Sequence, residues 1–215
     1  MAALPHDGGP DRDGQDVATL RARFRDRKTA LIEHFRSARP TATAARQLLR
    51  ALTRHVDATL AELWARSGLP AGAALVAVGG YGRAALFPHS DVDVVVLLPD
   101  DATASDIARE AVERFVGACW DVGVEIGSSA RSVAQCLDEA ARDVTVQTAL
   151  LESRLVCGAR RLHAQLQRGF DAAMDPAAFL RAKTLEMKQR HVKYEGTPYS
   201  LEPNCKESPG GLRDL

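Results

Sequence analysis

The sequence has little of several features that mark common protein classes. Aromatic residues make up only 5% of it, and 28 Lys and Arg balance 28 Asp and Glu. A balanced charge provides no basic surface for nucleic acid, which argues against a polymerase or an RNA-modifying enzyme. No apolar run is long enough to span a bilayer, and none resembles a secretory signal. We therefore expect a cytoplasmic protein without membrane or nucleic-acid partners.

Cysteine is scarce as well. The four cysteines are widely and irregularly spaced, at Cys119, Cys136, Cys157 and Cys205. This spacing matches neither a zinc motif nor a disulfide framework and fits a reducing compartment. At 215 residues the chain is long enough to bury the core of one or two domains.

Composition and hydrophobic periodicity divide the chain into five parts. We predict a disordered leader rich in Gly, Pro and Asp, two N-terminal helices, a catalytic core, a helical appendage and a Gly/Pro-rich tail. The boundaries are residues 1–16, 17–70, 71–135, 136–198 and 199–215. Within these parts, Thr41 or Thr43, Ser105 and Asp143 are predicted helix N-caps, and residues 145–156 are predicted to be helical.

The most informative stretch joins two apolar runs, residues 73–78 and 94–98. Between them lie the glycine cluster Gly79-Gly80-Tyr81-Gly82-Arg83 and the acids Asp91 and Asp93. Closely spaced glycines let backbone N–H groups approach a phosphate. The two acids are two residues apart at a strand start, so their carboxylates face the same side. Because such a pair needs a cation, and hard oxygen ligands suit Mg²⁺, we predict a two-metal phosphoryl or nucleotidyl transfer site.

Two other interpretations of this stretch are weaker. A Gly-Gly-x-Gly sequence alone indicates only a turn, and Asp-x-Asp alone is often a solvated strand end. Their combination between two apolar strands argues against both readings. A dinucleotide-binding loop is the other alternative, but the glycine cluster lacks the full fingerprint and no helix is predicted before Pro88.

Residues 122–127 alternate apolar side chains with Gly or Glu, which predicts a third strand with one buried face. Glu125 lies in the middle of this pattern, where an unpaired buried carboxylate would be costly. Either Glu125 belongs to the site or it faces solvent at a sheet edge. Asp143 is a competing acid, for which we favour the role of helix N-cap.

Several strings are similar to a known family. The string GGYGRAALFPHSDVDVVVLLP, residues 79–99, resembles polymerase β-type nucleotidyltransferases and, more closely, the bifunctional PII uridylyltransferase/uridylyl-removing enzymes of bacterial nitrogen signalling. WDVGVEIGSSARS and the tail LEPNCKESPGGLRDL are also similar to this family. The chain departs from the family pattern at Ala85, where the family usually has Glu, and at Cys205 and Ser208.

The resemblance implies an α/β (α+β) fold with a small mixed sheet flanked by helices and an α-helical appendage. It implies Mg²⁺-dependent transfer of UMP from UTP to a tyrosine of the PII protein, with Mn²⁺ as the alternative metal. Asp91, Asp93 and Glu125 would be catalytic and would hold the metal. The residues that would bind the nucleotide are Gly79, Gly80, Arg83, Ser90, Lys206 and Arg213.

Two alternatives stay open: a nucleotidyltransferase of this fold with another acceptor, and a regulatory module that binds nucleotide without turnover, which Ala85 makes plausible. The family carries a later HD domain that removes UMP and ACT domains that sense glutamine. We expect this chain to be a fragment of such a multifunctional enzyme, with no uridylyl-removing activity.

Overall fold

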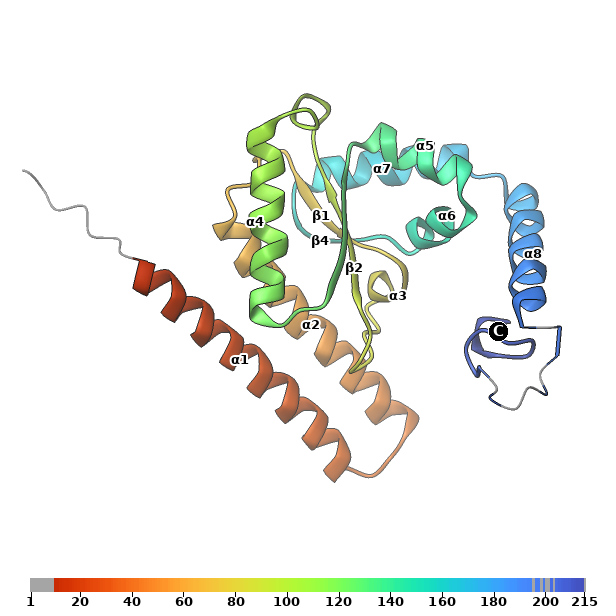
Figure 1. Cartoon of the computed structure of the whole chain (residues 1–215), viewed down its shortest axis with the longest axis horizontal. Coiled ribbons are helices and arrows are strands. Elements are labelled where there is room, and N and C mark those ends of the chain that lie inside the picture. Colours follow the sequence, from red (N-terminus) through yellow and green to blue (C-terminus); the bar gives the residue numbers. More distant parts are fainter. Residues whose placement is uncertain (1–9, 195, 198, 200–201, 203, 215) are drawn as a thin grey trace, which may run out of the picture.

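A mixed β-sheet lies at the centre of the protein, which we describe from a computed structural model covering residues 10–194, 196–197, 199, 202 and 204–214 (Figure 1). The strand order is β3-β2-β1-β4. The strands are β1 (Ala74–Ala77), β2 (Val92–Leu97), β3 (Ile126–Arg131) and β4 (Arg154–Gly158). β1 runs antiparallel to β2 and β4, whereas β2 and β3 are parallel. The predicted α/β class with a small mixed sheet is confirmed.

One face of the sheet packs against α1 (Pro10–Ser37), α2 (Ala42–Arg66) and α4 (Asp106–Val122). Strand side chains alternate between faces, and β2 turns Val92, Val94 and Val96 toward this side. The helices contribute buried residues at helical spacing, among them Leu60 in α2 and Phe115 in α4. This larger core joins the N-terminal helices to the sheet.

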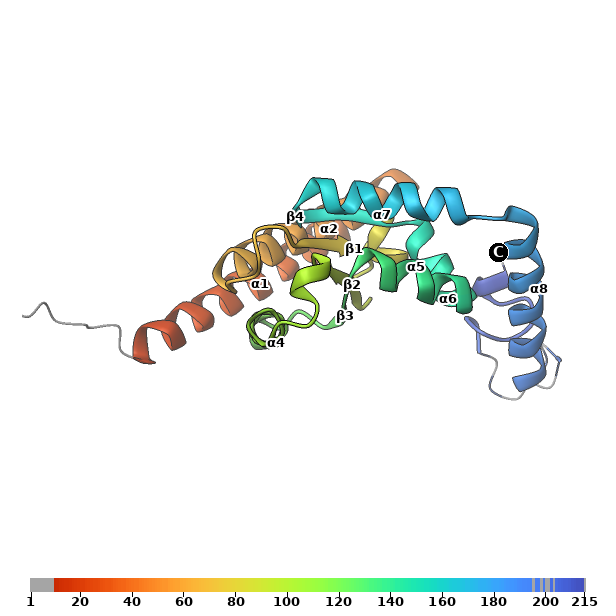
Figure 2. The same ribbon diagram turned by 90° about the horizontal axis from the view of Figure 1, so that it is seen from above.

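The other face packs against α5 (Val133–Arg142), α6 (Val144–Leu151) and α7 (Arg160–Ala173). Figure 2 shows α4 and α7 on opposite sides of the sheet. Val95 and Leu97 belong to this second core. Asp93 is two residues before Val95 on the same strand, so its side chain leaves the sheet on the α5–α6 side.

Three predicted helix N-caps are confirmed. The Thr41 side chain accepts a hydrogen bond from the backbone N–H of Ala44 at the start of α2. Ser105 accepts one from Ala108 at the start of α4, and Asp143 accepts one from Thr145 at the start of α6. The side chain of Asp143 therefore serves a helix terminus, as the sequence indicated.

Two element boundaries differ from the prediction. Residues 10–16 were predicted to be disordered, but they form the first turns of α1, where Pro10 needs no N–H partner at the first helical position; residues 1–9 lie outside the described residues. The predicted strand at residues 122–127 begins only at Ile126. α4 extends to Val122, and Gly123 ends it in the left-handed conformation with φ 90°.

The largest correction concerns the predicted helix at residues 145–156. α6 ends at Leu151, and residues 154–158 form β4 instead, pairing antiparallel with β1. The pairing with a buried strand outweighs the local helical pattern, because β1 would otherwise leave its backbone groups unpaired on that edge. The sheet therefore includes part of the segment that was assigned to the helical appendage. Leu150, near the end of α6, is buried.

Residues 204–214, the C-terminal segment, pack on α8 (Pro176–Lys193). A short 3-10 helix spans Leu212–Asp214 in this segment. The buried Arg190 side chain donates to Asp214 Oδ1 at 2.8 Å and to the Glu207 carbonyl at 2.9 Å. Arg190, the Gly210 N–H and His191 together lower the pKa of Asp214 to about 2.

Among the residues described, no helix combines the length and apolarity needed to cross a membrane.

An ion pair ties α2 to β4 and to the turn after β1. Arg154 binds the Asp57 carboxylate through two nitrogens, at 2.9 and 3.0 Å, and the Tyr81 hydroxyl donates to the same carboxylate. The Arg154 guanidinium also lies 5.2 Å from the centre of the Tyr81 ring. Burial and the Asp57 charge raise the pKa of Tyr81, so its hydroxyl stays protonated and can only donate to Asp57.

We expect Arg154→Met to lower the free energy of unfolding by about 2 kcal/mol. Removing one partner of a buried pair costs roughly 3–5 kcal/mol, and the cost is smaller here because both side chains keep 27% exposure. Urea denaturation followed by circular dichroism measures the change. Arg160→Met, at the exposed first residue of α7, is the control and should shift stability by at most about 0.5 kcal/mol. Equal stability of the two variants would show that the pair is not important.

Candidate active site

The glycine cluster forms a tight turn between β1 and β2. It was predicted to be a loop, but Gly79–Gly82 make a single helical turn, α3, which begins at Gly79 with φ 55°. A Cβ on Gly82 would lie 1.9 Å from the carbonyl oxygen of Glu152. A side chain cannot fit there, so glycine at this position lets the turn pack directly on the α6–β4 connection.

The Asp93 carboxylate lies between this turn and the start of β3. The backbone N–H of Val78 donates to the Asp93 carbonyl at 3.0 Å, which brings the end of β1 beside the start of β2. Asp93 Oδ2 is 4.0 Å from the position of a Cβ on Gly79, and Oδ1 is 2.6 Å from that of a Cβ on Gly127. Two glycines on neighbouring segments thus leave room for the carboxylate.

Asp91 and Asp93 form a pair without a cationic partner. Burial, followed by the negative charge of Asp91, raises the pKa of Asp93. Within the part of the chain that the structure describes, neither carboxylate makes an ion pair or accepts a hydrogen bond. Two adjacent, unpaired carboxylates at a strand start fit a divalent cation with a preference for oxygen ligands.

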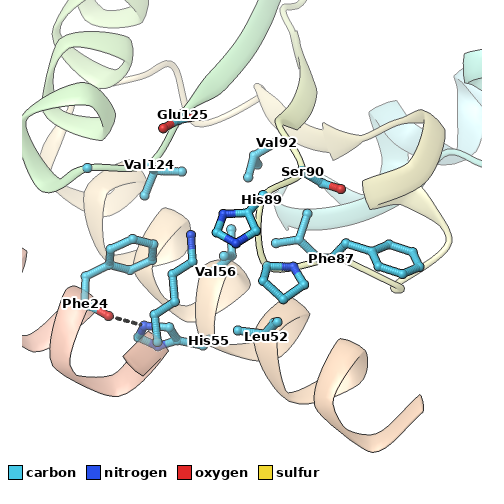
Figure 3. Close-up of a pocket in the computed structure, with 14 residues that line it drawn as sticks. Phe24, Leu52, His55, Val56, Phe87, His89, Ser90, Val92, Val124 and Glu125 are labelled. Carbon is cyan, nitrogen blue, oxygen red and sulfur yellow. Dashed lines mark hydrogen bonds between the residues drawn. The ribbon is translucent and has the colours of Figure 1, made fainter. Parts of the chain in front are cut away.

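The structure does not bring Glu125 into this pair. No group of three or more His, Cys, Asp or Glu side chains among the described residues is placed to hold a metal ion. Glu125 precedes β3 and, with Ser90, lines a cavity of about 100 Å³ (Figure 3). The other walls of that cavity include Phe24 and Val92, which belong to the core on the α1–α2 face. Asp93 lines a different cavity, on the α5–α6 face.

β3 begins at Ile126, so Glu125 lies just before the strand rather than in the middle of it. The sequence pattern treated Glu125 as the middle of a strand that would align it with Asp93. In the observed register Asp93 lies opposite Gly127, and Val92 donates to the carbonyl of Glu125 through its backbone N–H. The position that faces Asp93 on β3 is therefore a glycine rather than an acid.

The predicted phosphate-binding cations separate into two groups. Arg83 lies at the glycine turn: it pairs with Glu152 at 2.9 Å, and its Nη2 is 3.8 Å from the position of a Cβ on Gly80. Arg213 pairs with Glu207 at 3.0 Å in the C-terminal segment, to which Lys206 also belongs. Figures 1 and 2 show this segment against α8, apart from α3 and β2.

Two groups of residues at the site were not predicted from the sequence. Gly127 and Ser129 lie two residues apart on β3 and line the Asp93 cavity. The sequence analysis named only Glu125 as a site residue in this segment. Asp57 and Arg154 support the turn through Tyr81, although they are 97 residues apart. The run of small residues in Gly127-Ser-Ser-Ala-Arg131 could have indicated that Gly127 and Ser129 line a cavity. No local sequence pattern indicates that Asp57 and Arg154 form a pair.

A helical glycine turn between two antiparallel strands, with Asp93 beside it at the start of the second strand and Asp91 just before, defines a nucleotidyltransferase domain of the polymerase β type. Comparison with known families agrees, since the family described as "Nucleotidyltransferase domain" matches residues 58–142. A second family, "GlnD PII-uridylyltransferase", matches residues 178–215, which comprise most of α8 and the C-terminal segment.

Curated relatives match the chain over nearly its whole length. A bifunctional uridylyltransferase/uridylyl-removing enzyme of Cupriavidus pinatubonensis is 52% identical over 219 residues, covering 100% of this chain. Enzymes of the same description from Burkholderia vietnamiensis and Burkholderia pseudomallei are 56% and 54% identical over 93% and 91% of the chain. The chain belongs to this family. It spans only 22–24% of the length of these relatives.

We expect Gly127→Ala to reduce nucleotidyl transfer at least tenfold while changing stability by less than about 1 kcal/mol. Its Cβ would displace the flexible Asp93 carboxylate rather than the backbone, and displacements of about 1 Å in a site cost up to roughly 100-fold in rate. Gly117→Ala in α4 is the control, because its Cβ would meet nothing within 4 Å. Steady-state rates and thermal melting compare the two, and unchanged transfer by Gly127→Ala would contradict this geometry.

Proposed function

We propose that this chain transfers UMP from UTP to a tyrosine hydroxyl of a PII nitrogen-regulatory protein and releases pyrophosphate. The observation that carries the proposal is the Asp93 carboxylate held beside the Gly79–Gly80 turn, with Asp91 two residues before it and no cation of the described residues paired with either. The choice of uridylyl group rests on the names of the relatives, and the PII acceptor on the name of the second family.

Asp91 and Asp93 would hold Mg²⁺, or Mn²⁺ in its place. A bound divalent ion neutralises charge on the phosphates and lowers the pKa of a hydroxyl that it contacts. The role of the protein is to fix Asp93 at the start of β2 with Asp91 two residues before it. The close packing of Gly82 on Glu152 fixes the position of the turn relative to that strand.

The glycine turn would bind the leaving group. Backbone N–H groups at Gly79 and Gly80 would donate to the β- and γ-phosphates, and the exposed Arg83 guanidinium would add charge-assisted hydrogen bonds. Glu152 holds Arg83 over the turn, so the cation is positioned before the nucleotide arrives. Ser90, Lys206 and Arg213 would need to move to contribute, and we assign them no step.

The proposed reaction places the protein in the cytoplasm, where UTP is available. Its direct test is to incubate the chain with UTP, MgCl₂ and a PII protein and to weigh the PII protein by mass spectrometry. A mass gain of one UMP and an equal amount of pyrophosphate are expected. Binding of UTP without any product would instead identify a regulatory nucleotide-binding module. Transfer to another protein but not to PII would identify a different acceptor.

We expect Asp93→Asn to reduce UMP transfer at least about 100-fold without unfolding the protein. The substitution removes the charge that a divalent ion requires but keeps the size of the side chain. Asp100→Asn, on the exposed 3-10 turn after β2, is the matched control and should transfer at the wild-type rate. Activity of Asp93→Asn within tenfold of wild type would contradict the assignment of this carboxylate.

Glu125→Gln should keep transfer within about threefold of the wild-type rate, because Gly127 rather than Glu125 lies opposite Asp93 and no metal-binding group of three such side chains occurs among the described residues. The same mass-spectrometric assay at saturating UTP measures this. A loss comparable with that of Asp93→Asn would show that Glu125 joins the carboxylate pair when nucleotide binds.

A further inference from the structure

The cavity beside Asp93 is formed by the sheet and by two helices of the second core. It has a volume of about 260 Å³ and lies between the first halves of β2 and β3 and the helices α5 and α6. Ser128, Ser129 and Arg131 supply its polar groups. Its walls are otherwise small or apolar side chains, chiefly Val78, Val95, Cys136, Val146, Ala149 and Leu150. Burial raises the pKa of Cys136 to about 11, so this thiol is neutral at physiological pH.

The position of the cavity relative to Asp93 indicates from which side an attacking hydroxyl would reach the phosphorus. The glycine turn lies near Oδ2 of Asp93, whereas Gly127, at the edge of the cavity, lies near Oδ1. In phosphoryl transfer the attacking and leaving oxygens are roughly in line on opposite sides of phosphorus. If the leaving pyrophosphate occupies the glycine turn, the attacking hydroxyl must come from the opposite side of the phosphorus, where the cavity opens.

We propose that this cavity receives the aromatic ring of the acceptor tyrosine and so positions its hydroxyl for attack. This inference rests on the proposed function. The phenol oxygen would form a bond to the α-phosphorus while the bond from that phosphorus to pyrophosphate breaks. The bonding electron pair leaves with pyrophosphate, and the phenol proton passes to solvent. The product is a tyrosyl ester of UMP.

The size and lining of the cavity fit one aromatic side chain. Its volume is below the range of about 300–1,000 Å³ that is usual for pockets enclosing whole small-molecule ligands. An aromatic ring has apolar faces that match Val146, Leu150 and Val95, and its hydroxyl would point toward Asp93. Ser128 is exposed and Ser129 half-buried, so their hydroxyls are available to the peptide groups that flank the tyrosine.

The uracil base of UTP is the competing occupant. A base there would lie on the side of the α-phosphate that the acceptor needs, so the tyrosine would have no in-line approach. The two occupants predict different effects of filling the cavity. Loss of the acceptor site should leave UTP binding intact, whereas loss of a base site should weaken it.

Ala149→Phe fills the cavity from α6. We expect kcat/KM for the PII protein to fall at least tenfold, with the Kd for UTP in the presence of Mg²⁺ within twofold of wild type by calorimetry. Ala141→Phe, at an exposed position of α5, is the matched control and should change neither value. Equal behaviour of the two variants would overturn the proposal, and so would a parallel loss of UTP binding in Ala149→Phe.

A second measurement needs no variant and does not depend on turnover. N-acetyl-L-tyrosinamide is titrated into the unmutated chain while the methyl resonances of Val146 and Leu150 are followed by NMR. We expect these resonances to shift, and to shift equally when the chain is saturated with UTP and Mg²⁺. Absence of shifts, or displacement of the amide by UTP, would overturn the proposal. A chain that binds the amide at this site but neither binds UTP nor modifies PII would refute the proposed function alone.

Discussion

The ion pair between Asp57 and Arg154 sets the position of the glycine turn, and the site depends on that position. Asp57 is on α2 and Arg154 is on β4, and both contact Tyr81, which is the third residue of the turn. A bidentate arginine–carboxylate pair fixes orientation as well as distance, so it holds the three segments in one arrangement. Gly82 then packs against the Glu152 carbonyl without any intervening side chain. These contacts fix the turn where it lies beside Asp93.

The two faces of β2 have different surroundings. Val92, Val94 and Val96 join the core with α2 and α4, whereas the side that carries Asp93 stays partly open toward α5 and α6. An unpaired carboxylate pair destabilises a fold unless a cation neutralises it, and Asp93 shows this through its raised pKa. The valines on the opposite side supply apolar burial that offsets this cost. β2 is thus buried on both faces except at Asp93, which lies at the start of the strand.

Residues 204–214 pack on α8. Arg190 is nearly buried there and binds both Asp214 and the Glu207 carbonyl, and His191 contacts the same carboxylate. The family description that matches residues 178–215 covers this segment, whereas the nucleotidyltransferase description covers residues 58–142. The first matched region thus holds β1, β2 and β3, and the second holds most of α8 and the residues that pack on it. Lys206 and Arg213 contribute to the surface of the C-terminal segment, not to the glycine turn.

Local sequence determined the helix caps at Thr41, Ser105 and Asp143 and the placement of Asp93 on the face of β2 opposite Val92 and Val94, because each follows from interactions within a few residues. Apolar runs of strand length predicted β1 and β2, whereas the small mixed sheet was implied by the resemblance to the family. Only the tertiary structure decided that residues 154–158 form a strand, since their hydrogen-bond partners are on β1. It likewise decided which residue of β3 lies opposite Asp93, because the register of β3 against β2 places Gly127 there rather than Glu125. Register is a relation between two strands, and a pattern within one strand does not contain it.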